Sequence, residues 1–234
     1  MIMNKNVIIA CDFENKEILM NFLKDFEGLN PFIKIGMEMY YKEGPSLVRE
    51  LKSKGFKIFL DLKLHDIPNT VKSAMRQIGE LGVDITNVHA EGGIQMMKAA
   101  REGLDMTESG KKTKLIAVTV LTSIDDEMLH NELLINNNFM VSDVAKHYAK
   151  NAKKAGLDGV VCSAFESNIM SDLGLISVCP GIRLDGDSKN DQKRVATPRL
   201  AKENKASYIV VGRSITKALN PVEAYKECLK EFND

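Results

Sequence analysis

Short apolar runs rich in valine and isoleucine alternate with longer segments in which apolar residues recur at helical spacing. The short runs predict strands over 7–13, 32–36, 57–64, 84–90, 115–121, 159–163, 175–179 and 208–211. The amphipathic segments predict helices over 14–26, 45–54, 70–81, 94–102, 141–155, 166–173, 198–204 and 221–232. Gly55, Gly82 and Gly156 follow three of these helices directly, which is typical of helix ends.

Strands that are separated by helices pair in parallel, because a parallel pair needs a long crossover between its strands. Eight strand–helix units in a chain of this length predict a closed (β/α)8 barrel, the TIM barrel fold of the α/β class. A doubly wound open sheet is the alternative. There is no linker or low-complexity segment, so we expect a single domain over 1–234.

The run 57–64 carries charge inside an apolar strand. Successive strand side chains point to opposite faces, so Leu60, Leu62 and Leu64 share one face and Asp61 and Lys63 share the other. Charge is costly to bury unless it is paired. The pattern indicates a functional site, with a purely structural ion pair as the alternative.

Other predicted strands also end in polar residues, at the end of the barrel where active sites of this fold lie. They are Asp12, Lys34, His89 and Thr122. Simpler interpretations exist: Asp12 as a helix cap, Lys34 reaching solvent, and His89 hydrogen-bonded in the core. His65, His130 and His147 are expected to be surface or packing residues.

The last two strands predict a phosphate site. Pro180, Gly181 and Arg183 follow the seventh strand, and Gly212 and Arg213 follow the eighth. Glycine lets backbone N–H groups approach an anion, and arginine binds phosphate through two parallel hydrogen bonds. Two long connections, 122–140 and 183–197, are expected to be binding loops or lids, or else surface excursions.

Composition narrows the possible partners. The 32 lysine and arginine residues balance the 32 aspartate and glutamate residues, so no overall charge favours nucleic acid or an anionic membrane. No stretch approaches the roughly 20 apolar residues of a membrane span. The four cysteines form no metal-binding pattern and are expected to be buried thiols. We expect a soluble, cytoplasmic protein.

The motif Asp61-x-Lys63-x-x-Asp66, continued by Ile67-Pro68-Asn69-Thr70, resembles the signature of the bacterial-type orotidine 5'-phosphate decarboxylases. The resemblance extends along the chain. It includes Asp12, Lys34-Ile35-Gly36, Val88-His89-Ala90, Leu121-Thr122-Ser123, Pro180-Gly181-Ile182-Arg183, Asp191-Gln192-Lys193-Arg194 and Val211-Gly212-Arg213-Ser214. Glu91 departs from the family pattern, which has a small residue there.

The resemblance implies decarboxylation of orotidine 5'-phosphate to uridine 5'-phosphate, the last step of de novo pyrimidine synthesis, without metal or cofactor. It implies a proton donor to C6 at Lys63 and a carboxylate beside the departing group at Asp61. It also implies a homodimer with active sites shared across the interface, in which Asp66 of the second subunit completes an array with Lys34, Asp61 and Lys63.

The remaining substrate-binding residues also follow from the resemblance. Ile67 and Thr70 reach across the dimer, and Asp12 and Lys34 hold the ribose. Thr122 meets the pyrimidine, and Gln192 bridges base and phosphate. The phosphate end is formed by Pro180, Arg183, Gly212 and Arg213.

The chemistry agrees with this interpretation, since loss of carbon dioxide from an unactivated ring leaves a carbanion that a preorganised cation stabilises. Two alternatives stay open. Sugar-phosphate decarboxylases and synthases of the same barrel resemble the Asp61-x-Lys63-x-x-Asp66 core but use magnesium and an enediolate. A non-catalytic phosphate-binding barrel is the other, although binding alone gains little from a lysine between carboxylates.

Overall fold

Eight parallel strands close into a barrel in a computed structural model that describes residues 6–185 and 195–233. Neighbours in sequence are neighbours in the sheet, and β1 closes the barrel by pairing with β8. The strands are β1 (Val7–Ala10), β2 (Phe32–Gly36), β3 (Lys57–Leu64), β4 (Ile85–His89), β5 (Lys114–Val118), β6 (Gly159–Val161), β7 (Ile176–Ile182) and β8 (Tyr208–Val211). The TIM barrel prediction is confirmed, and the open sheet is excluded.

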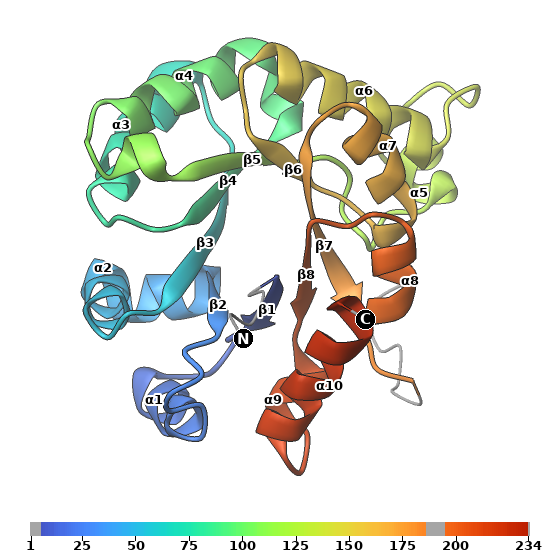
Figure 1. The fold of residues 1–234 in the computed structure, drawn as a ribbon. Coiled ribbons are helices and arrows are strands. Elements are labelled where there is room, and N and C mark those ends of the chain that lie inside the picture. Colours follow the sequence, from blue (N-terminus) through green and yellow to red (C-terminus); the bar gives the residue numbers. More distant parts are fainter. Residues whose placement is uncertain (1–5, 186–194, 234) are drawn as a thin grey trace.

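Helices surround the strands as an outer ring (Figure 1). They are α1 (Lys16–Lys24), α2 (Met37–Ser53), α3 (Pro68–Gly79), α4 (Gly93–Asp105), α5 (Asp126–Asn131), α6 (Val141–Lys154), α7 (Ser167–Asp172), α8 (Pro198–Glu203), α9 (Arg213–Thr216) and α10 (Pro221–Asn233). Three short 3₁₀ turns accompany them, at Ala90–Gly92, Gly110–Lys112 and Ala164–Glu166.

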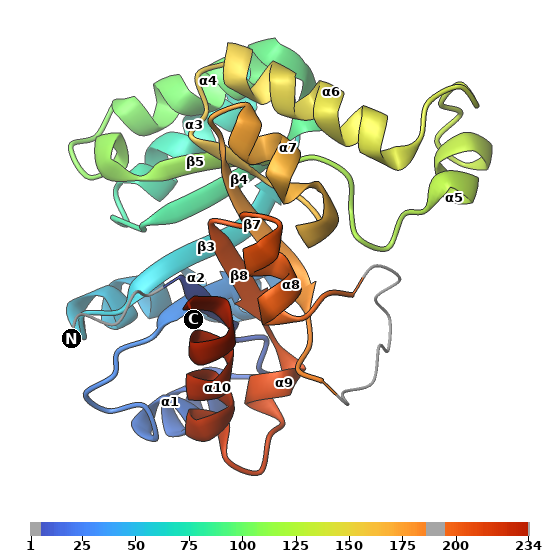
Figure 2. The ribbon, with the colours of Figure 1, turned by 45° about the vertical axis from the view of Figure 1, so that its right-hand side comes forward.

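The helices differ from the sequence prediction in three places. α2 begins eight residues before the predicted 45–54 segment, and Gly44 breaks it with a φ of 68°. α5 lies inside the 122–140 connection, where Asp125 caps it by accepting a hydrogen bond from the Met128 N–H (3.0 Å). The short α9 follows β8 directly. The polar residues of α5 hid its periodicity, and Figure 2 shows this helix standing away from the barrel strands.

Two hydrophobic layers form the core. The larger lies between the strands and the helices, and the smaller fills the barrel interior with Ile8, Ala10, Phe32, Phe59, Ile85, Ile116, Val178 and Val210. Residues two apart share a face, so Phe32 and Lys34 both point inward on β2, as do Phe59 and Asp61 on β3. The apolar inward-pointing side chains fill the barrel, and the charged ones lie nearer the carboxyl ends of the strands.

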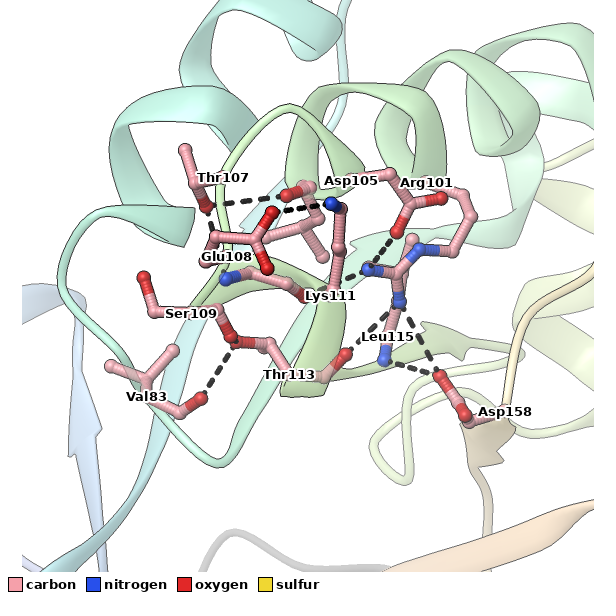
Figure 3. A network of polar contacts seen from close by, with 12 residues as sticks. Val83, Arg101, Asp105, Thr107, Glu108, Ser109, Lys111, Thr113, Leu115 and Asp158 are labelled. Atoms are coloured by element: carbon pink, nitrogen blue, oxygen red, sulfur yellow. Dashed lines mark hydrogen bonds and ion pairs between the residues drawn. The ribbon is translucent and has the colours of Figure 1, made fainter.

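A polar network ties the amino-terminal ends of the strands together (Figure 3). The Arg101 guanidinium on α4 donates to the carbonyl oxygens of Gly110 (2.8 Å) and Thr113 (3.0 Å) and pairs with Asp105 (2.8 Å). Asp158 accepts from the Leu115 N–H of β5 (2.8 Å). Residues at this end of a TIM barrel serve stability rather than chemistry.

The cysteine prediction is confirmed, because all four cysteines lie in the described part of the chain, are buried, and form no disulfide. Across residues 6–185 and 195–233, no helix has the length and apolar character to cross a bilayer.

Candidate active site

A row of alternating charges crosses the carboxyl-terminal end of β2 and β3. Lys63 Nζ lies 2.7 Å from Asp61 Oδ1, and Asp61 Oδ2 lies 3.7 Å from Lys34 Nζ. Lys34 Nζ in turn donates to Asp12 Oδ1 (2.8 Å), just beyond the end of β1. Three separate strands therefore bring together four of the residues singled out from the sequence.

The inner members of this row are buried. Lys34 is 9% exposed and Asp61 is 8% exposed. Burial alone would lower the pKa of Lys34, but Asp12 and Asp61 outweigh it and raise that pKa above its usual value. Burial alone would raise the pKa of Asp61, but Lys34 and Lys63, with hydrogen bonds from Lys63 and Asn87, outweigh it and lower that pKa. Both groups therefore stay charged at neutral pH.

Two simpler interpretations of these residues are wrong. Lys34 does not extend to solvent, since its ammonium group is held between two carboxylates inside the barrel mouth. Asp12 does not cap α1, because Asn15 takes that position and accepts from the Ile18 N–H (3.0 Å). Gly36 makes room for the pair, since a Cβ there would lie 2.9 Å from Asp12 Oδ1 and 3.1 Å from Lys34 Nζ.

β3 is irregular where it carries Asp61 and Lys63. Its pairing with β4 shifts register between Leu60 and Leu64, and Lys63 has a left-handed φ of 52°. The Lys63 N–H donates to Asn87 Oδ1 on β4 (2.8 Å), and Asn87 Nδ2 donates to Asp61 Oδ1 (2.7 Å). The alternation of side chains along a strand thus correctly predicts that Asp61 and Lys63 lie on one side of β3, but it does not predict the irregularity between them.

Two adjoining cavities open beside the charged row. One of about 370 Å³ is lined by Lys34, Asp61, Lys63 and Thr122 together with apolar side chains of β5 to β8. The other, about 420 Å³, is lined by Asp12, Lys34, Gly181, Arg183, Gly212, Arg213 and Lys217, among others. Lys34, Pro180 and Val210 border both cavities, so the two form one elongated site with an acid–base end and a cationic end.

The cationic end fits the predicted phosphate position. Arg183 is 7% exposed and follows β7, and its N–H donates to the Ala196 carbonyl (3.0 Å). Gly181 has a φ of 76°, which a residue with a side chain adopts only at a cost. Arg213 opens α9 directly after β8. These residues bring arginine side chains and backbone to one cavity, although Pro180 and Gly181, predicted to follow the seventh strand, lie inside β7 because the strand continues to Ile182.

Three predicted site residues of the described chain do not line these cavities. Asp66, Ile67 and Thr70 lie exposed on the connection from β3 into α3, and Ile67 is 67% exposed. The Asp66 side chain accepts a hydrogen bond from the Ile67 N–H (2.6 Å). Gln192, with its neighbours Asp191, Lys193 and Arg194, lies outside the described residues.

The histidines lie beside the site or on the surface. His89 stacks on His65 with ring centroids 5.7 Å apart, and burial lowers the pKa of His89. The His130 ring contacts the Phe139 carbonyl (2.9 Å), and His147 contacts Asn151 (3.1 Å). His65, His130 and His147 are packing or surface residues, as expected.

Sequence reasoning missed Asn87 and Lys217, which bond to or line the site, and it named Ser123 only as part of a motif. Asn87 had a partial signal, because it is an amide inside the predicted strand 84–90, but nothing local in the sequence gives its role. Among the described residues, no group of three or more histidine, cysteine or acidic side chains is arranged to hold a metal ion.

Comparisons with known proteins agree with this geometry. Residues 5–228 match the model of the orotidine 5'-phosphate decarboxylase / HUMPS family. The chain is 54% identical to an orotidine 5'-phosphate decarboxylase of Bacillus cereus, with 98% of each chain covered. It is similar in structure to the orotidine 5'-phosphate decarboxylase of Lactobacillus acidophilus (TM-score 0.87, 41% identity, 99% of this chain and 100% of that one). An uncharacterized conserved protein of Geobacillus kaustophilus is similar too (TM-score 0.84, 43% identity, 97% and 100% covered).

Proposed function

The chain belongs to the orotidine 5'-phosphate decarboxylase / HUMPS family, and from this membership we propose that it converts orotidine 5'-phosphate to uridine 5'-phosphate and carbon dioxide, with Lys63 as the proton donor to C6. It is a carboxy-lyase of pyrimidine biosynthesis. The observation that carries the proposal is the Lys63 ammonium group, held 2.7 Å from the buried Asp61 carboxylate at the edge of a cavity of about 370 Å³.

The electrostatics of that cavity suit the reaction. Departure of carbon dioxide leaves an electron pair on C6, in an orbital that no carbonyl group can drain. A fixed cation at that position stabilises the developing charge, and it does so most strongly where water is excluded. Val118, Val161 and Val178 line the same cavity and supply the apolar surroundings. Lys63 then delivers its proton to the carbon, and Asp61 lies beside the departing carboxylate.

The second cavity supplies binding energy far from the reacting carbon. Arg183 and Arg213 hold the phosphate there, with the Gly212 backbone beside them. Asp12 and Lys34 lie between the two ends, where a ribose would sit, and Thr122 faces the pyrimidine. Binding energy realised at the phosphate orients the ring against Lys63. By resemblance, Gln192 joins base and phosphate from the 183–197 connection.

A homodimer completes the proposal. Asp66, Ile67 and Thr70 are exposed and line neither cavity of their own chain. The resemblance places these residues against the second subunit, and the exposed Ile67 side chain is accessible for that contact. We assign these residues to the active site of the second subunit, where Asp66 extends the charge array beyond Lys63. The whole chain acts as one domain, in the cytoplasm and without a metal ion.

The decisive experiment follows the loss of orotidine 5'-phosphate absorbance with and without EDTA. We expect full activity in EDTA and no turnover by the Lys63→Ala variant, which should still bind uridine 5'-phosphate. Turnover retained by that variant contradicts the role of Lys63. Activity that disappears when the chelator is added favours the alternative assignment, in which this chain is a magnesium-dependent sugar-phosphate enzyme of the same family.

Subunit sharing needs a separate test. Lys63→Ala and Asp66→Ala chains, each inactive alone, are mixed and allowed to exchange subunits. If the sites are shared, a mixed dimer has one site with both residues intact, and part of the activity returns. A verified mixed dimer with no activity contradicts sharing.

A further inference from the structure

Asn87 is a wholly buried amide beside the charged row, at the end formed by Asp61 and Lys63. It lies on β4, is 0% exposed, and faces the barrel interior between Ile85 and His89. Its oxygen accepts from the Lys63 N–H (2.8 Å), and its nitrogen donates to Asp61 Oδ1 (2.7 Å). Both ends of one amide are therefore bonded to the two residues that carry the proposed chemistry.

The backbone that Asn87 contacts is strained. Between the Leu60–Thr86 and Leu64–Val88 pairs, β3 advances four residues while β4 advances two. Lys63 falls in this stretch with a φ of 52°, a conformation that costs on the order of 1 kcal/mol or more outside glycine. The regular ladder is interrupted here, and a buried N–H without a partner is costly. The Asn87 oxygen provides that partner.

The Asn87 nitrogen fixes the carboxylate as well. Asp61 Oδ1 receives hydrogen bonds from both Asn87 Nδ2 and Lys63 Nζ, each 2.7 Å long. The other oxygen, Oδ2, is thereby turned toward Lys34 Nζ at 3.7 Å. Rotation of the carboxylate would break one of these contacts, so the amide sets the direction of both oxygens.

We propose that Asn87 is a positioning residue that holds the left-handed turn at Lys63 and the rotation of Asp61, so that the ammonium group meets the reacting carbon. It lines neither cavity and therefore acts through these two residues rather than on the substrate. The proposal rests on the proposed function, because it assigns Asn87 to the geometry of the proton donor.

Thr86 provides a matched control on the same strand. It is also 0% exposed, and its hydroxyl donates to the Leu60 carbonyl of β3 (3.0 Å). It points to the opposite face, toward the helices, so its bond holds strand to strand without touching the charged row. Loss of either hydrogen bond should cost stability, but only Asn87 should affect the chemical step.

The experiment compares Asn87→Leu, which keeps the branching at Cγ but makes no hydrogen bonds, with Thr86→Val. For each variant, kcat, KM, the Kd of uridine 5'-phosphate and the urea midpoint are measured. We expect Asn87→Leu to lower kcat by about 100-fold, the effect of an ångström-scale misplacement. KM and Kd should change less than about fivefold, because the phosphate contacts are untouched. Thr86→Val should lower the urea midpoint and leave kcat unchanged.

Asn87→Ser decides the question if Asn87→Leu does not fold, since serine is too short to reach both partners. A folded Asn87 variant with wild-type kcat, or an equal fall of kcat in Thr86→Val, overturns the proposal. Lys63→Ala is assayed alongside. If it is inactive while the Asn87 variants are fully active, only the positioning role fails. If it retains turnover, the proposed function fails and the role of Asn87 fails with it.

Discussion

Gly36→Ala should damage the active site while leaving the fold intact. Gly36 has a φ of −91° and a ψ of −176°, which alanine adopts without strain. The new Cβ would lie 2.9 Å from Asp12 Oδ1 and 3.1 Å from Lys34 Nζ, both closer than van der Waals contact allows. The Asp12 side chain is 55% exposed, so it can move away. The Asp12–Lys34 hydrogen bond of 2.8 Å should therefore lengthen or break.

The size of the effect follows from that bond. A hydrogen bond between charged groups contributes about 1.5–3 kcal/mol, and the exposure of Asp12 reduces this to about 1–2 kcal/mol. If the substrate's ribose depends on this pair, kcat/KM should fall about 5- to 30-fold. Thermal stability should fall by less than the value of this bond, since replacing glycine at a compatible position stabilises a protein by about 0.4–1 kcal/mol and offsets part of the loss.

The assay is steady-state decarboxylation, with thermal unfolding followed in parallel. Asp12→Ala provides the control background, because the bond is already absent there and Lys34 can shift into the vacated space. Gly36→Ala should then add almost nothing, so the two changes should be strongly non-additive. A kcat/KM within twofold of wild type for Gly36→Ala alone, or full additivity in the double variant, would refute the reasoning.

Four further outcomes are expected. Arg213→Ala should raise the Kd of uridine 5'-phosphate far more than Lys63→Ala does, because it removes a contact to the phosphate; equal Kd values would contradict the phosphate assignment. Arg101→Met removes two charged hydrogen bonds to carbonyl groups, so urea unfolding should show a loss of about 2–4 kcal/mol with KM unchanged. The pKa of Asp61 is lower in the folded protein than its unfolded value of about 4, so the ionised carboxylate adds to the free energy of unfolding above that pH. The difference in free energy of unfolding between wild type and Asp61→Asn should therefore shrink as pH falls through the folded pKa. A difference that does not change with pH would contradict this. Burial raises the pKa of the Cys11 thiol, so native protein should resist iodoacetamide at that residue until denaturant is added, as mass spectrometry of the alkylated peptide would show.

The eight strands could be predicted from the sequence because their side chains are buried on both faces. Such strands contain little besides valine, isoleucine and leucine, and the runs 32–36, 57–64 and 208–211 match the observed bounds. The helices were predicted less well. The first part of α2 carries Tyr41 and Lys42 on an exposed surface, and α5 is short and polar, so neither shows the apolar periodicity of a packed helix.

Part of the site could also be predicted from local sequence. Asp61 and Lys63 are unusual in an apolar strand, and Arg213 directly follows the last strand. Asn87 could not be assigned in this way, because asparagine in a strand has no fixed meaning until its neighbour across the sheet is known. Asp66 shows a different limit of prediction from sequence. Its motif is clear from the sequence, yet its side chain is exposed in the single chain and contacts neither cavity.

The sequence by itself determined the order of strands and helices, the apolar faces, and the kinds of charged group available to the site, because these depend on residues close together in the chain. Only the tertiary structure decided that Lys34 lies between Asp12 and Asp61, that β3 takes two more residues than β4, and that Asn87 bonds to both Asp61 and Lys63. Closure of the barrel sets these distances, since it fixes the register of each strand against its neighbours. Charges that are far apart in sequence can influence one another only after that register is set.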